Sequence, residues 1–250
     1  MKDVFKQLSM PAGASFFDLF LDFSTMHASI KKRGDLPETP TDSKRKASPT
    51  LNPSTTVVQF KKWQKVVPHF LFEGGVPFFQ LQVATSETVC YTHLLKLFLS
   101  RSRSVFVTGV TGVGKTMLIE QVLTSLSSTA ANIPSSSRSE IELQLRKNFK
   151  PVQLAFSAQS SSFRTQQNIE ASLDKKGRSL YGAPPQQRVA IFVDDVNMPV
   201  VEQYGAQPPI ELLRLFLGLK GFYDRSTWQW KAVEDTTLLC AAAPPAGGRA

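Results

Sequence analysis

Cysteine and histidine are scarce in this 250-residue sequence, which contains two cysteines and three histidines. Cys90 and Cys240 are too few and too far apart to predict a disulfide framework or a zinc site. The histidines show no metal-ligand spacing. These absences exclude a disulfide-stapled secreted domain and a zinc-finger module, and they favour a reducing compartment.

Long hydrophobic runs are also missing. The most apolar stretch near the start, "FFDLFLDF" at residues 16–23, contains Asp18 and Asp22 and is far too short to span a bilayer. We therefore expect no membrane segment, no membrane partner and no secretory signal.

Clustered positive charge is likewise absent, although the net charge is +9. The basic residues are spread along the chain, apart from "KRK" at residues 44–46 and a few lysine pairs. Spread charge is typical of a solvated surface, so no nucleic-acid partner is expected.

What the chain does have is apolar content, 42% of its residues, which is enough for a substantial core. Composition and pattern divide it into four segments. These are a lead-in at 1–33, a linker or disordered insert at 34–56 rich in proline, serine and threonine, an approach segment at 57–100, and a core at 101–250.

A glycine-rich loop, "GVTGVGKT" at residues 109–116, begins this core. It fits the pattern of glycine, four residues, glycine, lysine and then serine or threonine. An apolar strand is predicted just before it at 104–108, and apolar residues at helical spacing follow from Met117 to Leu126. The strand-loop-helix context favours a phosphate-binding loop over an ordinary glycine turn.

The chemistry of this loop assigns roles to its residues. Its glycines let backbone N–H groups converge on phosphate oxygens, Lys115 would reach the β and γ phosphates, and the Thr116 hydroxyl would ligate magnesium. The predicted cofactors are ATP or ADP with Mg²⁺. The predicted nucleotide-binding residues are Gly109, Val110, Thr111, Gly112, Val113, Gly114, Lys115, Thr116, Met117 and Asp194.

A second acidic element follows a predicted buried strand at 189–194, within "AIFVDD". Asp194 would hold Mg²⁺ together with Thr116. Asp195 stands where many hydrolysing enzymes have a glutamate that orients the attacking water, and its side chain is one methylene shorter. We therefore predict Lys115 and Asp195 as catalytic residues, with slow or absent hydrolysis. The plainer interpretation of the acidic pair is a strand end that caps a loop.

Two more apolar strands are predicted, at 152–157 and 237–243, with helical stretches between the strands. This alternation predicts a parallel α/β sheet. Ser157 and Gln159 lie at the end of the first of these strands, where they would contact a ligand or cap the loop. Trp228 and Trp230 would pack in the core or mark an interface, and core packing is favoured.

The loop, "IFVDDVNMP" at 191–199 and "YGAQPPIELLR" at 204–214 together resemble the AAA+ motor ring of dynein heavy chains. The combination is similar to the third AAA+ module of an axonemal (ciliary) type, and "FYDR" at 222–225 matches as well. The similarity covers about residues 57–250. The chain departs from the family's usual pattern at Ala84, Glu87 and Cys90, and Ala243 stands where many AAA+ proteins have a sensing asparagine.

The resemblance implies a P-loop NTPase (AAA+) sheet with flanking helices, truncated before a fifth strand and a helical lid. It implies an ATP-binding module, regulatory in character, of a parent that moves towards microtubule minus ends and drives ciliary or flagellar movement. The implied partners are neighbouring AAA+ modules, dynein intermediate and light chains, and microtubules through the parent. The implied location is the cytoplasm and cytoskeleton, in the dynein complex of the ciliary axoneme.

Two alternatives stay open at this stage. One is a stand-alone P-loop ATPase that remodels nucleic acid or protein, favoured only by the positive charge. The other is a structural module that binds nucleotide without hydrolysing it.

Overall fold

The structure is a computed structural model that describes residues 18–22, 59–70, 72, 81–128 and 148–244. The chain divides into two compact units, Met1–Pro77 with Leu81–Cys90, and Phe78–Gln80 with Tyr91–Ala250. Most of the predicted lead-in and all of the predicted insert at 34–56 lie outside the described residues.

The first unit contains a small antiparallel pair, β1 (Leu19–Asp22) and β2 (Gln59–Lys62), followed by a 3-10 turn, η3 (Trp63–Lys65). The ring of Phe20 stacks on Trp63 with 4.5 Å between centroids. The stretch that contains Asp18 therefore contributes a short strand. None of the helices in the described part of the chain is long and apolar enough to cross a membrane.

The second unit is built on a sheet of four parallel strands. In space they run β3 (Val105–Thr108), β10 (Thr236–Ala242), β7 (Gln187–Asp194) and β4 (Asn148–Ala155). β10 thus lies between the strand that leads into the glycine loop and the strand that ends at the acidic pair. The predicted parallel α/β sheet is confirmed.

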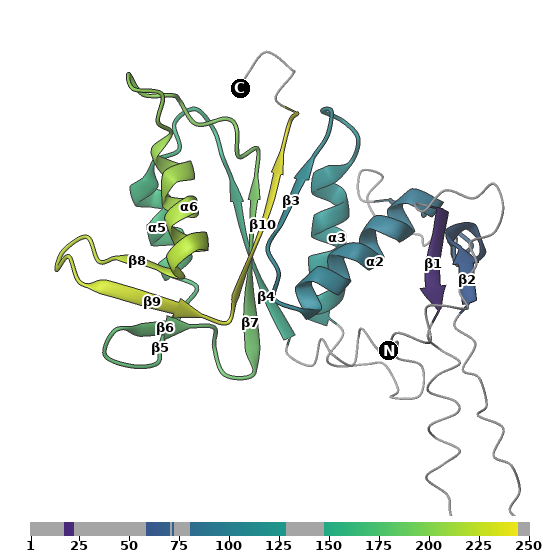
Figure 1. The fold of residues 1–250 in the computed structure, drawn as a ribbon, viewed down its shortest axis with the longest axis horizontal. Helices are drawn as coiled ribbons and strands as arrows, with labels where there is room; N and C mark the ends of the chain where they lie inside the picture. Colours follow the sequence, from purple (N-terminus) through teal and green to yellow (C-terminus); the bar gives the residue numbers. More distant parts are fainter. Residues whose placement is uncertain (1–17, 23–58, 71, 73–80, 129–147, 245–250) are drawn as a thin grey trace, which may run out of the picture. The chain divides into compact units, whose positions relative to one another are not determined.

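Helices cover both faces of this sheet (Figure 1). α3 (Lys115–Ser128) and the end of α2 (Ser86–Ser100) pack on one face, and α5 (Ser162–Glu170) and α6 (Pro208–Leu219) pack on the other. The side chains of β7 alternate between the faces. Ala190 and Phe192 join the α2–α3 core, whereas Val189, Ile191 and Val193 join the α5–α6 core. Burial on both faces explains why this strand is a continuous apolar run.

The predicted strands agree with the observed ones within two residues, except for β4. It begins at Asn148, four residues before the predicted start, and ends at Ala155. Lys150 and Pro151 concealed this start because neither reads as a buried strand residue. Proline is tolerated there because β4 bonds only to β7 within the described sheet, and an edge strand can lack one N–H donor.

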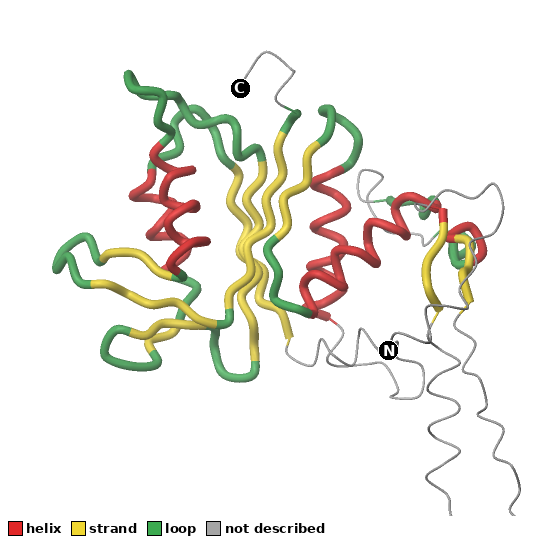
Figure 2. The backbone as a smooth tube through the Cα atoms, in the orientation of Figure 1, coloured by secondary structure: helices red, strands yellow, loops and turns green. Residues whose placement is uncertain are grey.

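A second, mixed sheet was not predicted. It pairs β5 (Asp174–Lys175), β6 (Leu180–Gly182), β9 (Trp230–Glu234) and β8 (Gly221–Tyr223) in that order, and Figure 2 shows it beside the two helices of the α5–α6 layer. Its strands are too short to carry a clear apolar pattern.

A charged network attaches this second sheet to α5. Lys231 Nζ lies 2.6 Å from Asp224 Oδ2 and 3.2 Å from Glu170 Oε2. The hydrogen bond from Lys231 holds the pKa of the Asp224 carboxyl well below its usual range. Gln166, which is buried on α5, donates from Nε2 to the carbonyl oxygen of Tyr223 at 2.8 Å.

The two tryptophans differ in their environments. Trp228 is 75% exposed in the turn between β8 and β9, with a left-handed φ of 57°, so core packing is wrong for this residue. The backbone N–H of Trp228 donates to Asp224 O at 2.9 Å within this turn. Trp230 is half-buried in β9, and its ring meets Tyr223 edge-on at 5.0 Å.

Candidate nucleotide-binding site

The candidate site lies at the carboxyl ends of β3, β10 and β7, where open α/β sheets bind their ligands. Two backbone hydrogen bonds join the segments that meet there. The Gly109 N–H donates to Ala242 O at 3.3 Å, and the Val196 N–H donates to Ala241 O at 3.0 Å. The end of β10 is therefore flanked by the glycine loop and by the segment that follows the acidic pair.

The glycine loop has the backbone that its sequence requires. Gly112 and Gly114 adopt φ values of +87° and +84°, a region that side chains with a Cβ disfavour. The Leu118 N–H donates to Gly114 O at 3.0 Å, so the first turn of α3 begins at the end of the loop. The free N–H groups of a helix start thus follow directly on the loop, an arrangement suited to phosphate oxygens.

The predicted loop side chains lie in different environments. Lys115 is half-buried as the first residue of α3, and its Nζ donates to Gly109 O at 2.7 Å and Val110 O at 3.0 Å. The ammonium group is therefore held against the loop backbone. Thr111 and Val113 are exposed, while Met117 is half-buried.

A direct side-chain contact joins the loop to the acidic pair. Thr116 Oγ1 donates to Asp194 Oδ2 at 2.7 Å, across 78 residues of sequence. The other carboxylate oxygen, Asp194 Oδ1, accepts from the Asp195 N–H at 3.0 Å. Both oxygens are thereby oriented, and a hydroxyl beside a carboxylate is the kind of oxygen set that Mg²⁺ prefers.

Asp195 itself is exposed at the end of β7 and has a left-handed φ of 51°. Aspartate tolerates this conformation better than most residues, because its short polar side chain can bond locally. The structure thus places Asp195 directly after Asp194, whose carboxylate accepts a hydrogen bond from Thr116, and leaves the Asp195 side chain open to solvent.

Asn197 is a residue at this site that the sequence analysis missed. Its Oδ1 accepts a hydrogen bond from the Ala243 N–H at 3.4 Å. The signal available in the sequence was its position, three residues after Asp194 in the motif that supplies the acidic pair.

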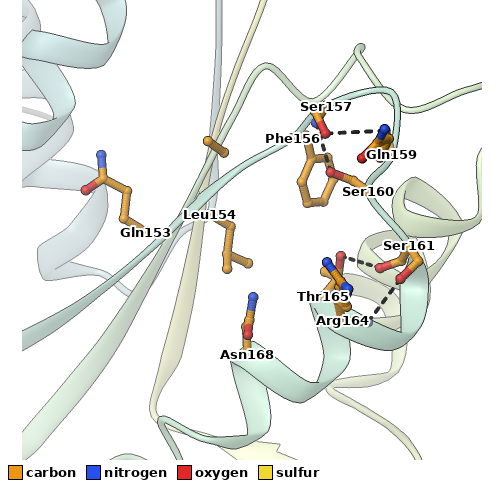
Figure 3. A pocket seen from close by; sticks show the side chains of 11 residues that line it. Gln153, Leu154, Phe156, Ser157, Gln159, Ser160, Ser161, Arg164, Thr165 and Asn168 are labelled. Carbon is orange, nitrogen blue, oxygen red and sulfur yellow. Dashed lines mark hydrogen bonds between the residues drawn. The ribbon is translucent and has the colours of Figure 1, made fainter.

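A pocket of about 280 Å³ lies beside this site, at the end of β4 and the start of α5 (Figure 3). None of the residues that line it belongs to the glycine loop or the acidic pair. Ser157 and Gln159 do line it, and they cap their own loop. The Ser157 N–H donates to Ser160 Oγ at 2.8 Å, and Ser157 Oγ accepts from the Gln159 N–H at 3.3 Å.

The described residues of this site include neither a reactive cysteine nor a cluster of three or more metal-ligating side chains. Burial raises the pKa of the Cys240 thiol to about 12, so the sulfur in β10 stays protonated and weakly nucleophilic. Among the described residues, no group of three or more histidine, cysteine, aspartate or glutamate side chains could hold a metal ion.

Comparison with known proteins identifies the family. Residues 70–143 and 135–250 match the family described as "P-loop containing dynein motor region". The chain is 42% identical over 187 residues to human dynein axonemal heavy chain 6, and 35% identical over 193 residues to human dynein axonemal heavy chain 1. These alignments cover 75% and 77% of this chain but 4% of each relative, so the chain spans a small part of the proteins it resembles. The chain, with its parallel P-loop sheet of the AAA+ type, belongs to the dynein motor-region family.

Proposed function

We propose that this chain is a magnesium-dependent ATP-binding module of an axonemal dynein heavy chain. The single observation that carries the proposal is the 2.7 Å hydrogen bond from Thr116 Oγ1 to Asp194 Oδ2. It joins the helix that begins at the phosphate-type loop to the strand that supplies an acid, which is the pairing that a magnesium–nucleotide complex requires.

The residues present fit that ligand. The N–H groups that follow Gly112 and Gly114 would donate to phosphate oxygens, and Lys115 would exchange its two carbonyl acceptors for phosphate. Thr116 and Asp194 would hold Mg²⁺, which when bound neutralises charge on the β and γ phosphates.

The proposal extends to a regulatory role within the parent heavy chain. We assign the chain to the third AAA+ module, in which occupancy of the site would bias packing against neighbouring modules. The parent's minus-end-directed movement on microtubules, its intermediate and light chains, its cytoplasmic and axonemal location and its role in ciliary movement belong to the same proposal. The axonemal names of the relatives support it.

Slow hydrolysis is part of this proposal. Asp195 is one methylene shorter than glutamate, and Ala243 has no polar side chain. A site with both features suits prolonged nucleotide occupancy better than rapid turnover. The alternative, a structural module that never hydrolyses ATP, rests on the same two residues.

The magnesium requirement tests ATP binding directly. Thr116→Val keeps the shape of the side chain but removes the hydroxyl. We therefore expect affinity for ATP in Mg²⁺ to fall by about tenfold, because one of the two side chains that would hold the metal loses its oxygen. Equilibrium dialysis of ATP with the 250-residue chain, in Mg²⁺ and in EDTA, measures it.

Thr124→Val is the matched control, since Thr124 is exposed on the same helix two turns later. This substitution should leave the affinity for ATP unchanged, both in Mg²⁺ and in EDTA. A Thr116→Val chain that bound ATP with the full magnesium dependence of the wild type would contradict the assignment of the metal site.

Asp195→Glu separates a slow enzyme from a structural module. If Asp195 orients the attacking water and its length limits the reaction, the added methylene should raise turnover by at least about tenfold. Phosphate release from bound ATP in single-turnover experiments measures it. Asp174→Glu, at an exposed position in β5, should change nothing. Equal rates for wild type and Asp195→Glu would favour the structural alternative.

A further inference from the structure

The carboxyl end of β10 occupies a central place in the candidate site. β10 lies between β3 and β7, so its end stands between the glycine loop and the strand that ends at Asp194. The residues there, Ala241, Ala242, Ala243 and Pro244, bring no polar side chain. Any polar side chain that contacts a ligand at this point must therefore come from another segment.

Asn197 comes from such a segment. The peptide unit between Ala242 and Ala243 accepts the Gly109 N–H through its carbonyl and donates its own N–H to Asn197 Oδ1. The C=O and N–H of a trans peptide point in opposite directions, and no described peptide bond is cis. One peptide unit therefore has the glycine loop on one side and the Asn197 carboxamide on the other.

The orientation of the carboxamide follows from this contact. A backbone N–H can only donate, so the oxygen of Asn197 faces Ala243, and the Nδ2 group lies on the other branch of the amide. Asn197 Nδ2 makes no hydrogen bond to a residue within the described ranges, although the side chain is half-buried. As far as the described residues go, both N–H donors of this group are therefore available to a ligand.

Backbone hydrogen bonds on both sides of Asn197 hold it in place. The Val196 N–H donates to Ala241 O at 3.0 Å, and the Met198 N–H donates to Asp195 O at 2.9 Å. A donor on a turn fixed in this way loses little freedom when it binds a ligand, which is a requirement for selective recognition.

We infer that Asn197 is the residue that distinguishes ATP from ADP, by donating from Nδ2 to the terminal phosphate of ATP. This inference rests on the proposed nucleotide-binding function. Lys115 and Thr116 would hold the phosphates and Mg²⁺ from the loop side, and Asp194 would hold Mg²⁺ from the end of β7. Asn197 follows Asp194 by three residues, on the β7 side of β10, so its carboxamide would face the terminal phosphate held with Mg²⁺.

The test compares the affinities of the 250-residue chain for ATP and for ADP, each with Mg²⁺. Asn197→Ala should weaken ATP binding by about tenfold while ADP binding changes by less than about twofold, because one hydrogen bond to a charged oxygen is lost only with ATP. Asn197→Asp retains the acceptor for Ala243 but replaces the donor with a negative charge. It should lower the ATP-to-ADP preference further.

Asn168→Ala is the control, since Asn168 is exposed on α5, outside the glycine loop and the acidic pair. Thermal unfolding of each variant checks that it is folded. Folded Asn197 variants with the wild-type ATP-to-ADP ratio would overturn the inference and leave the proposed function intact. A folded wild-type chain that bound neither nucleotide would overturn both.

Discussion

Lys115→Ala is expected to lower the affinity of the chain for ATP by at least about a hundredfold, because it removes the cation that faces the phosphates. In the structure, Nζ of Lys115 donates to the carbonyl oxygens of Gly109 and Val110, at 2.7 and 3.0 Å. The ammonium group is thus already positioned over the loop. Little side-chain freedom is therefore lost when the ammonium group exchanges these two carbonyl acceptors for phosphate oxygens.

Equilibrium dialysis of ATP in Mg²⁺ measures the effect, and thermal unfolding confirms that the variant is folded. The matched control is Lys175→Ala, in β5 of the second sheet, where the lysine is exposed. Both variants lose one positive charge, so a general effect of net charge would appear in both. A comparable loss in the two variants, or none in Lys115→Ala, would refute the phosphate-binding role of the loop.

The main sheet was predictable because its strands are buried on both faces. Val189, Ile191 and Val193 face one layer of helices and Ala190 and Phe192 face the other, so no polar residue interrupts the run. Such runs are visible in the sequence, and so is the helical spacing after the glycine loop. The early part of β4 was not predictable, because an edge strand admits Lys150 and Pro151 without loss of the sheet.

The second sheet escaped prediction for a different physical reason. Its strand pairing joins segments far apart in sequence, such as β6 with β9, in which Leu180 lies opposite Ala232. Two- and three-residue strands give no alternation long enough to recognise. Trp228 is exposed because it lies in the turn that joins β8 and β9. The residue type alone, tryptophan, does not predict this exposure.

In the candidate site, too, local sequence patterns were predictable and contacts between distant segments were not. A local motif predicted the loop, and a strand that ends in an acid predicted Asp194; the hydrogen bond from Thr116 shows that these two segments meet. The catalytic role of Asp195 stays a prediction. Asn197 was missed because its significance comes from a contact with Ala243, 46 residues later, that depends on how neighbouring strands end.

Phe192→Ala is expected to lower the free energy of unfolding by about 3–5 kcal/mol, as is typical when a buried phenylalanine leaves a cavity. Phe192 is 0% exposed and belongs to the core between the sheet and α3. A domain of this kind has about 5–15 kcal/mol of stability in total, so the loss is a large fraction of it. Urea denaturation followed by tryptophan fluorescence measures the change.

Phe106→Ala is the matched control, because Phe106 is the same residue type in β3 of the same sheet but is 59% exposed. We expect that substitution to cost less than about 1 kcal/mol. Equal losses for the two variants would mean that Phe192 does not pack as the structure shows.

Saturating ATP with Mg²⁺ should raise the stability of the Phe192→Ala chain, since a ligand that binds only the folded state adds its binding free energy to the folding equilibrium. Lys115→Ala should abolish that increase, because the lysine contributes to ligand affinity rather than to the core.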